Sequence, residues 1–156
     1  MNQLDGWNAS GRRVYLGLLH DWNRQDAAAA MAARFAERGS LVGFDGSAID
    51  GRACIEAHLR PIFAAHPTPL FVGRVREVRR MAGGQTLLLR AIAGMWPRDA
   101  TELNPALNAV QTMVLSLNDG AYRIEMFQNT PAAFHGRPEE SERLSAELRE
   151  LGRPER

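Results

Sequence analysis

Between residues 70 and about 130, hydrophobic and polar residues alternate with a period of two, which predicts a series of β-strands. The first hairpin is predicted at residues 70–81 and 86–96, with Gly83-Gly84 at its turn. Its valines recur every three residues instead of every two, so we expect a β-bulge near Arg74 or Arg76. A loop from Pro97 to Ala106 then leads into a second hairpin.

The second hairpin is predicted to turn at Asp119-Gly120, a dipeptide typical of two-residue turns. This turn places four facing pairs on one side of the sheet: Leu117 with Tyr122, Leu115 with Ile124, Met113 with Met126, and Gln111 with Gln128. A buried amide without partners costs about 1–3 kcal/mol. We therefore expect water, a neighbouring strand or a bound molecule to meet the two glutamines, unless they bind each other. The pattern predicts an enclosed pocket at one end of a curved sheet.

The N-terminal half shows helical periodicity instead. Residues 1–9 are expected to form a loose arm, and a helix capped by Ser10 follows, with Val14, Leu18 and Trp22 on its buried stripe. An alanine-rich helix is predicted from Asp26 to about Arg38, and a short strand at residues 41–44. A third helix, from Asp50, carries these residues on one face: Ile55, His58, Leu59, Ile62 and Phe63.

Pro138 is predicted to begin a final amphipathic helix with Leu144, Leu148 and Leu151 on its apolar side. Helices followed by an antiparallel meander indicate an α+β fold, in which a strongly curved antiparallel sheet wraps three N-terminal helices and leaves a conical cavity. We expect one domain over residues 1–156, with its core at 10–136 and the C-terminal helix at 138–152.

Composition narrows the function classes. A net charge of +1 gives no reason to expect nucleic acid or an anionic membrane as a partner. All 19 basic residues are arginine, which excludes a Schiff-base lysine. The single cysteine, Cys54, is expected to be a small buried hydrophobe, and it fits a reducing cytoplasm. We expect no membrane span, because no apolar run approaches about 18 residues, and no signal peptide, because the N-terminus lacks a basic segment followed by an apolar one.

Two stretches resemble a known superfamily. Trp22-Asn23-Arg24-Gln25-Asp26 resembles the W-N-x-x-D signature of NTF2-like, or SnoaL-like, proteins, and Asp50-Gly51-Arg52-Ala53-Cys54-Ile55 resembles the entry to their third helix. The stretch from Gln128 to Pro138 resembles the SgcJ/EcaC-type branch, whose members occur in bacterial natural-product clusters, including those for enediynes.

The resemblance implies a cone-shaped α+β barrel that forms a homodimer through its outer sheet face. It also implies a small-molecule pocket protein of polyketide- or enediyne-type secondary metabolism, acting as a cofactor-free cyclase, isomerase or accessory enzyme. A non-catalytic protein that binds or sequesters such a ligand is the alternative, and a dimerisation module with a vestigial pocket is a third reading.

Reactions of the superfamily set a test for this chain. The positions that correspond to the proton-transferring groups of ketosteroid isomerases are Leu18, Gly43 or Phe44, and Met113, none of which can move a proton. The carboxylates that a limonene-type epoxide hydrolase needs are absent from the core face of the last hairpin, and Glu77 opposite Arg90 indicates a surface ion pair.

The ligand site is predicted from the remaining inward-facing residues. His58 and Asp45 are the candidate acid–base pair, although His58 also fits a satisfied core histidine and Asp45 a turn residue. The candidate binding residues for a small hydrophobic or polycyclic ligand are Trp22, Phe44, Trp96, Gln111, Met113, Met126 and Gln128. We expect no metal, because the four histidines are widely spaced, and no dinucleotide cofactor, because no Gly-x-Gly-x-x-Gly follows a strand.

The outer face of the last hairpin indicates self-association. It is predicted to carry Val110, Thr112, Val114 and Phe127, which is an apolar patch that a closed homodimer would cover. His135, at the exit of the last strand, is expected to be a latch for the C-terminal helix.

Overall fold

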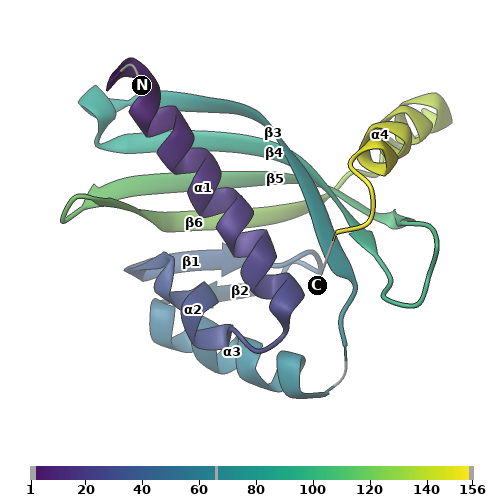
Figure 1. The fold of residues 1–156 in the computed structure, drawn as a ribbon, viewed down its shortest axis with the longest axis horizontal. Coiled ribbons are helices and arrows are strands. Elements are labelled where there is room, and N and C mark those ends of the chain that lie inside the picture. The colour runs from purple at the N-terminus through teal and green to yellow at the C-terminus, as the bar shows by residue number, and fades with distance from the viewer. Residues whose placement is uncertain (1–2, 66, 155–156) are drawn as a thin grey trace.

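The computed structural model describes residues 3–65 and 67–154. In chain order its elements are α1 (Gln3–Arg24), α2 (Ala28–Ala33), β1 (Phe35–Val42), β2 (Ala48–Asp50), α3 (Arg52–Ala65), β3 (Leu70–Met81), the 3₁₀ turn η1 (Ala82–Gly84), β4 (Thr86–Trp96), β5 (Asn104–Asn118), β6 (Ala121–Pro131) and α4 (Pro138–Glu150) (Figure 1).

One six-stranded curved sheet organises the fold, with the strand order β2-β1-β6-β5-β4-β3. The first strand runs parallel to β6, so the sheet is mixed and not purely antiparallel as predicted. Consecutive residues of β3 separate the two faces: Phe71 packs in the main core with α1 and α3, while Leu70 and Val72 pack with Leu144 and Leu148 of α4. The final helix therefore covers the face opposite to α1, near one end of the sheet (Figure 1).

The first helix is longer than predicted. It begins at Gln3, so the expected loose arm at 1–9 is wrong from residue 3 onward, and residues 1–2 lie outside the described part. Trp7 packs against the core cluster and extends the buried stripe by two turns. The stripe is hard to recognise in the sequence because Gly11 interrupts it. A Cβ on Gly11 would lie 3.2 Å from Val78, so this glycine lets the helix approach β3 closely.

The second helix is shorter than predicted. It ends at Ala33, and the residues expected to continue it to Arg38 form β1 instead. Strand pairing overrides alanine's helical preference here, since the backbone N–H of Ile124 donates to the carbonyl of Arg34 (2.9 Å). Gly39 permits this close approach, because a Cβ there would lie 2.4 Å from the carbonyl oxygen of Ile124.

The last hairpin contains a β-bulge that the alternating pattern did not reveal. Leu117 opposes Tyr122 and Leu115 opposes Ile124 as predicted, but the register shifts before Val114. Met113 then opposes Phe127, and Gln111 opposes Asn129. The bulged residue, Glu125, accepts a hydrogen bond from the Ser116 hydroxyl (2.6 Å). The extra residue lets Ile124 and Phe127, three positions apart, both lie in the core.

The first long hairpin and the final helix agree with the sequence analysis. The β3–β4 register shifts between Val75 and Glu77, which confirms the bulge expected near Arg76. Glu77 and Arg90 form the predicted ion pair (3.0 Å). The last helix begins with Pro138 and buries Leu144 and Leu148. Within the described ranges, no helix is long and apolar enough to cross a membrane.

Candidate ligand-binding groove

The Trp22–Asp26 motif fixes the start of β3. The Trp22 indole N–H donates to the carbonyl of Pro69 (3.0 Å). The buried side chain of Asn23 pairs with the backbone of Phe71 twice, through Nδ2 to the carbonyl (3.0 Å) and through Oδ1 from the N–H (2.7 Å). These bonds join segments almost 50 residues apart. The motif therefore has a structural role, which is to hold the start of β3 against the end of α1.

Gln25 extends this clamp to the segment before β3. Its backbone has a positive φ of 65°, and its side-chain oxygen accepts the N–H of Thr68 (2.9 Å) while its amide nitrogen donates to the carbonyl of Trp22 (2.9 Å). Arg98, from the loop after β4, donates to the carbonyls of Thr68 and Asn23 (2.8 Å each). The end of α1, the start of β3 and the loop after β4 are therefore cross-linked at this point.

A groove of about 1070 Å³ lies beside the cross-linked segments. Its lining comes from the turn after α1, the end of α3, the segment before β3 and the loop after β4: Asn23–Asp26, Phe63–Ala65, Pro67, Pro69 and Pro97–Asp99. Phe63 stacks edge-on against Trp22 (5.4 Å between ring centroids), and Trp22 in turn contacts Phe71 (5.4 Å). These three aromatic rings thus form a continuous contact from the groove to the core. Arg24 and Asp26 form an ion pair (3.4 Å) on its rim.

The interior polar contact expected at Gln111 is supplied by the protein itself. Gln111 is fully buried, and the Tyr15 hydroxyl donates to its Oε1 (2.7 Å). Its Nε2 donates to Oδ1 of Asn129 (3.1 Å). Burial raises the pKa of the Tyr15 phenol far above its usual value, so this group stays a neutral donor. Gly73 leaves room for the phenol, because a Cβ there would lie 2.4 Å from its oxygen.

The predicted amide pair is consequently wrong as a pair. Gln128 is exposed and opposes Thr112, while Met126 opposes Val114 on the outer face. Met113 is fully buried in the main core, in agreement with the pattern. Trp96 lies on the opposite face, in the cluster under α4, where its indole N–H donates to the carbonyl of Ala100 (3.1 Å). The structure does not bring these residues together around one pocket.

His58 is exposed, contrary to the prediction that it shares the buried stripe of α3 with Ile55 and Leu59. Asp45 is also exposed, and its Oδ1 accepts the backbone N–H of Ser47 (2.9 Å). Hydrogen bonds from Ser47 lower the pKa of Asp45, and the nearby charge of His58 adds a small contribution in the same direction. Phe44, beside Asp45, is half-buried. A catalytic role for these side chains stays a prediction.

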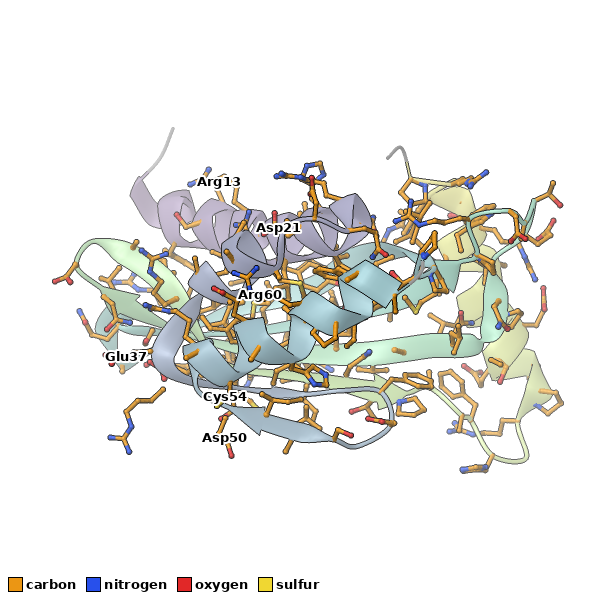
Figure 2. All side chains as sticks on the ribbon, turned by 90° about the horizontal axis from the view of Figure 1, so that it is seen from below. Arg13, Asp21, Glu37, Asp50, Cys54 and Arg60 are labelled. Carbon is orange, nitrogen blue, oxygen red and sulfur yellow. The ribbon has the colours of Figure 1, made fainter. Side chains whose placement is uncertain are left out.

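Cys54 and His135 are both exposed, contrary to the roles predicted for them. Cys54, expected to be buried, is exposed on α3 (Figure 2). His135 is exposed as well, and it forms no side-chain hydrogen bond that would latch α4 within the described residues. Across residues 3–65 and 67–154, no three histidine, cysteine or acidic side chains gather as a metal site would require.

Solved structures share this fold at low sequence identity. A domain of unknown function with a cystatin-like fold from Nostoc punctiforme has a TM-score of 0.75 and 23% identity, over 96% of this chain and 93% of that one. ActVI-ORFA from Streptomyces coelicolor has a TM-score of 0.65 and 18% identity, over 81% and 98%. A putative scytalone dehydratase from Novosphingobium aromaticivorans has a TM-score of 0.65 and 11% identity, over 80% and 83%.

These similarities show the fold alone: the chain has the mixed α+β fold of solved proteins that are described as cystatin-like or NTF-2 like. No protein-family model matches the sequence. No curated protein matches it either. A shared fold does not by itself define a function.

Proposed function

We propose that the chain is a small-molecule-binding protein whose ligand occupies the groove between the ends of α1 and α3. The main support is a groove of about 1070 Å³ that has the aromatic side chain of Phe63 in its lining. Hydrogen bonds of Asn23, Gln25 and Arg98 fix the walls of this groove. A site that is rigid before binding loses less conformational entropy when its ligand arrives. Concave surfaces with apolar walls and a few polar groups are the usual form of small-molecule sites.

The lining favours a flat hydrophobic or polycyclic ligand. Three prolines and Phe63 supply apolar contact, and the Arg24–Asp26 pair offers both a donor and an acceptor at the rim. A place in polyketide- or enediyne-type secondary metabolism is part of this proposal. Its support is the fold shared with ActVI-ORFA and with a protein named as a putative dehydratase of scytalone, together with the resemblance of residues 128–138 to the SgcJ/EcaC-type branch.

Binding without catalysis is the better-supported role for the groove. Among the described residues its titratable lining consists of Arg24, Asp26, Arg98 and Asp99, and Asp26 is already paired with Arg24. The interior phenol of Tyr15 is held neutral by burial and hydrogen-bonded to Gln111, so it is not available as a base.

A cofactor-free acid–base enzyme is the second candidate. The observation that supports it is that the charge of His58 contributes, as the smallest cause, to the lowered pKa of Asp45. This pair lies at the surface between the end of β1 and α3. If it is catalytic, His58→Gln lowers turnover of the authentic substrate by roughly 10²–10⁴-fold while its binding changes little.

Calorimetric titration with 2,7-dihydroxynaphthalene, a stable bicyclic phenol, tests whether the ligand binds in the groove or at the surface beside His58 and Asp45. We expect Phe63→Ala to weaken binding by roughly tenfold or more, because the variant loses the aromatic wall. Phe44→Ala, beside the His58–Asp45 pair, and Phe134→Ala, under α4, are matched controls that should bind as the wild type does. Unchanged binding in Phe63→Ala, or a loss in Phe44→Ala alone, would exclude the groove.

A homodimer through the outer sheet face also stays a proposal. The bulge at Glu125 changes its composition, since Phe127 is buried and Met126 takes the outer position beside Val114. Val110 is 36% exposed on the same face. Covering this patch would remove apolar surface from water. Light scattering at micromolar concentrations should give twice the chain mass, and a monomer mass would refute the dimer.

A further inference from the structure

A second pocket lies at the opposite end of α1 from the groove. Figure 1 shows this N-terminal end of α1 beside the turn that joins β3 to β4. The volume of the pocket is about 470 Å³, within the range of small-molecule sites. It is lined by residues from three separate parts of the chain: Gly6, Trp7, Ser10 and Arg13 from α1, Arg80 and Gly83–Gln85 from the first hairpin, and Leu117 and Tyr122 from the second.

The charge of the described lining is positive. Arg13 and Arg80 both line the pocket, and no aspartate or glutamate does so among the described residues. Neither arginine forms an ion pair with a side chain of residues 6–65 or 67–154, the part of the chain whose side chains the structure describes. The hydrogen bonds that they make go to neutral acceptors, from Arg13 to the Ser10 hydroxyl (3.1 Å) and from Arg80 to the Gly83 carbonyl (3.2 Å). A guanidinium carries five N–H donors, so most of its capacity is left for an anion.

The hairpin turn holds Arg80 against the pocket. Gly83 and Gly84 have φ values of 66° and 94°, a region that favours glycine. A Cβ on Gly84 would lie 2.9 Å from Nε of Arg80, so a larger residue there would displace the guanidinium from its place over the turn. Arg13 comes from α1, so two guanidinium groups reach the same pocket from different elements. An arginine fork matches the geometry of a carboxylate.

Aromatic side chains form the rest of the pocket. Trp7 and Tyr122 are half-buried and pack against the main core. The Tyr122 hydroxyl donates to the carbonyl of Gly84 (2.7 Å), which fixes its ring beside the turn. Aromatic walls favour a flat apolar body over a compact inorganic ion. We propose that this pocket binds small aromatic carboxylates, with the carboxylate at Arg13 and Arg80 and the ring system against Trp7 and Tyr122.

Calorimetric titration with 2-naphthoate tests the proposal on the full chain. We expect binding that weakens as sodium chloride is raised, because the contact is ionic and exposed. The neutral isostere 2-naphthamide and inorganic phosphate should each bind roughly tenfold or more weakly, since one lacks the charge and the other the ring. Equal affinity for 2-naphthamide, or tighter binding of phosphate, would overturn the proposal.

Variants then locate the site. Arg13→Gln and Arg80→Gln should each weaken 2-naphthoate binding by roughly tenfold or more. Arg143→Gln, at an exposed site on α4, is the matched control for loss of one positive charge. Phe134→Ala, under α4 and outside both cavities, should leave 2-naphthoate binding unchanged. Thermal melts confirm that each variant is folded. Wild-type affinity in both arginine variants, or a loss in Phe134→Ala, would place the carboxylate elsewhere.

Discussion

Replacing Tyr15 by phenylalanine perturbs one hydrogen bond in the centre of the fold. The substitution removes the donor to Oε1 of Gln111, and both side chains have no solvent exposure. The acceptor then stays buried without its partner, which costs about 1–3 kcal/mol. For a chain of this length, about 2 kcal/mol corresponds to a lowering of the melting temperature by roughly 4–8 °C.

Urea denaturation and thermal melts of Tyr15→Phe measure this cost. Tyr122→Phe is the control, because its hydroxyl donates to the carbonyl of Gly84 at a half-buried position where water can replace it. The double variant Tyr15→Phe/Gln111→Leu should lose less stability than the sum of the single variants, since it removes donor and acceptor together. A Tyr15→Phe variant within about 0.5 kcal/mol of the wild type would refute the buried hydrogen bond.

Three other predictions test the fold around the site. Asn23→Ala leaves the backbone N–H and carbonyl of Phe71 unpaired and should cost about 2–4 kcal/mol in urea denaturation; a loss below about 0.5 kcal/mol would contradict the clamp. Leu148→Ala empties a fully buried position under α4 and should cost about 2–5 kcal/mol, whereas an unchanged midpoint would show that α4 is not docked. Because burial raises the pKa of Tyr15 in the folded state, its contribution to stability is present below about pH 10 and is lost as the pH rises above that value. The wild type should therefore lose stability there faster than Tyr15→Phe, by about 1.4 kcal/mol per pH unit, and parallel curves would count against it.

Local signals were sufficient for part of the fold. The β3–β4 hairpin follows from Gly83-Gly84, whose positive φ values the turn requires, and the last helix follows from Pro138 at its first position. The bulge at Arg76 could be predicted because the three-residue step between valines is visible in the sequence.

The pattern of hydrophobic and polar residues did not predict the features that depend on packing between distant segments. The bulge at Glu125 is set by the burial of Ile124 and Phe127 together, and one extra residue exchanges the faces of Met126 and Phe127. The end of α2 is set by the pairing of β1 with β6, which the alanine-rich sequence does not reveal. These two errors account for the misplaced outer face and for the overlong second helix.

The site was the least predictable feature. Gln111 was correctly identified as a buried amide in need of a partner, but its partner is Tyr15, which lies 96 residues away and beside the apolar stripe used to identify the helix. The Trp22–Asp26 motif was recognised, yet its role follows only from its contacts with Thr68, Pro69 and Phe71. His58 fits the helical spacing of a buried stripe, although it lies at the edge of that stripe and is exposed.

Mapping amide chemical-shift changes on addition of 2,7-dihydroxynaphthalene tests the groove most directly, because it locates the ligand without assuming a site. The account predicts the largest changes at residues 23–26, 63–65 and 98–99, which line the groove. Changes confined to the neighbourhood of Phe44 and His58, or to the pocket at Gly83 and Gly84, would contradict it.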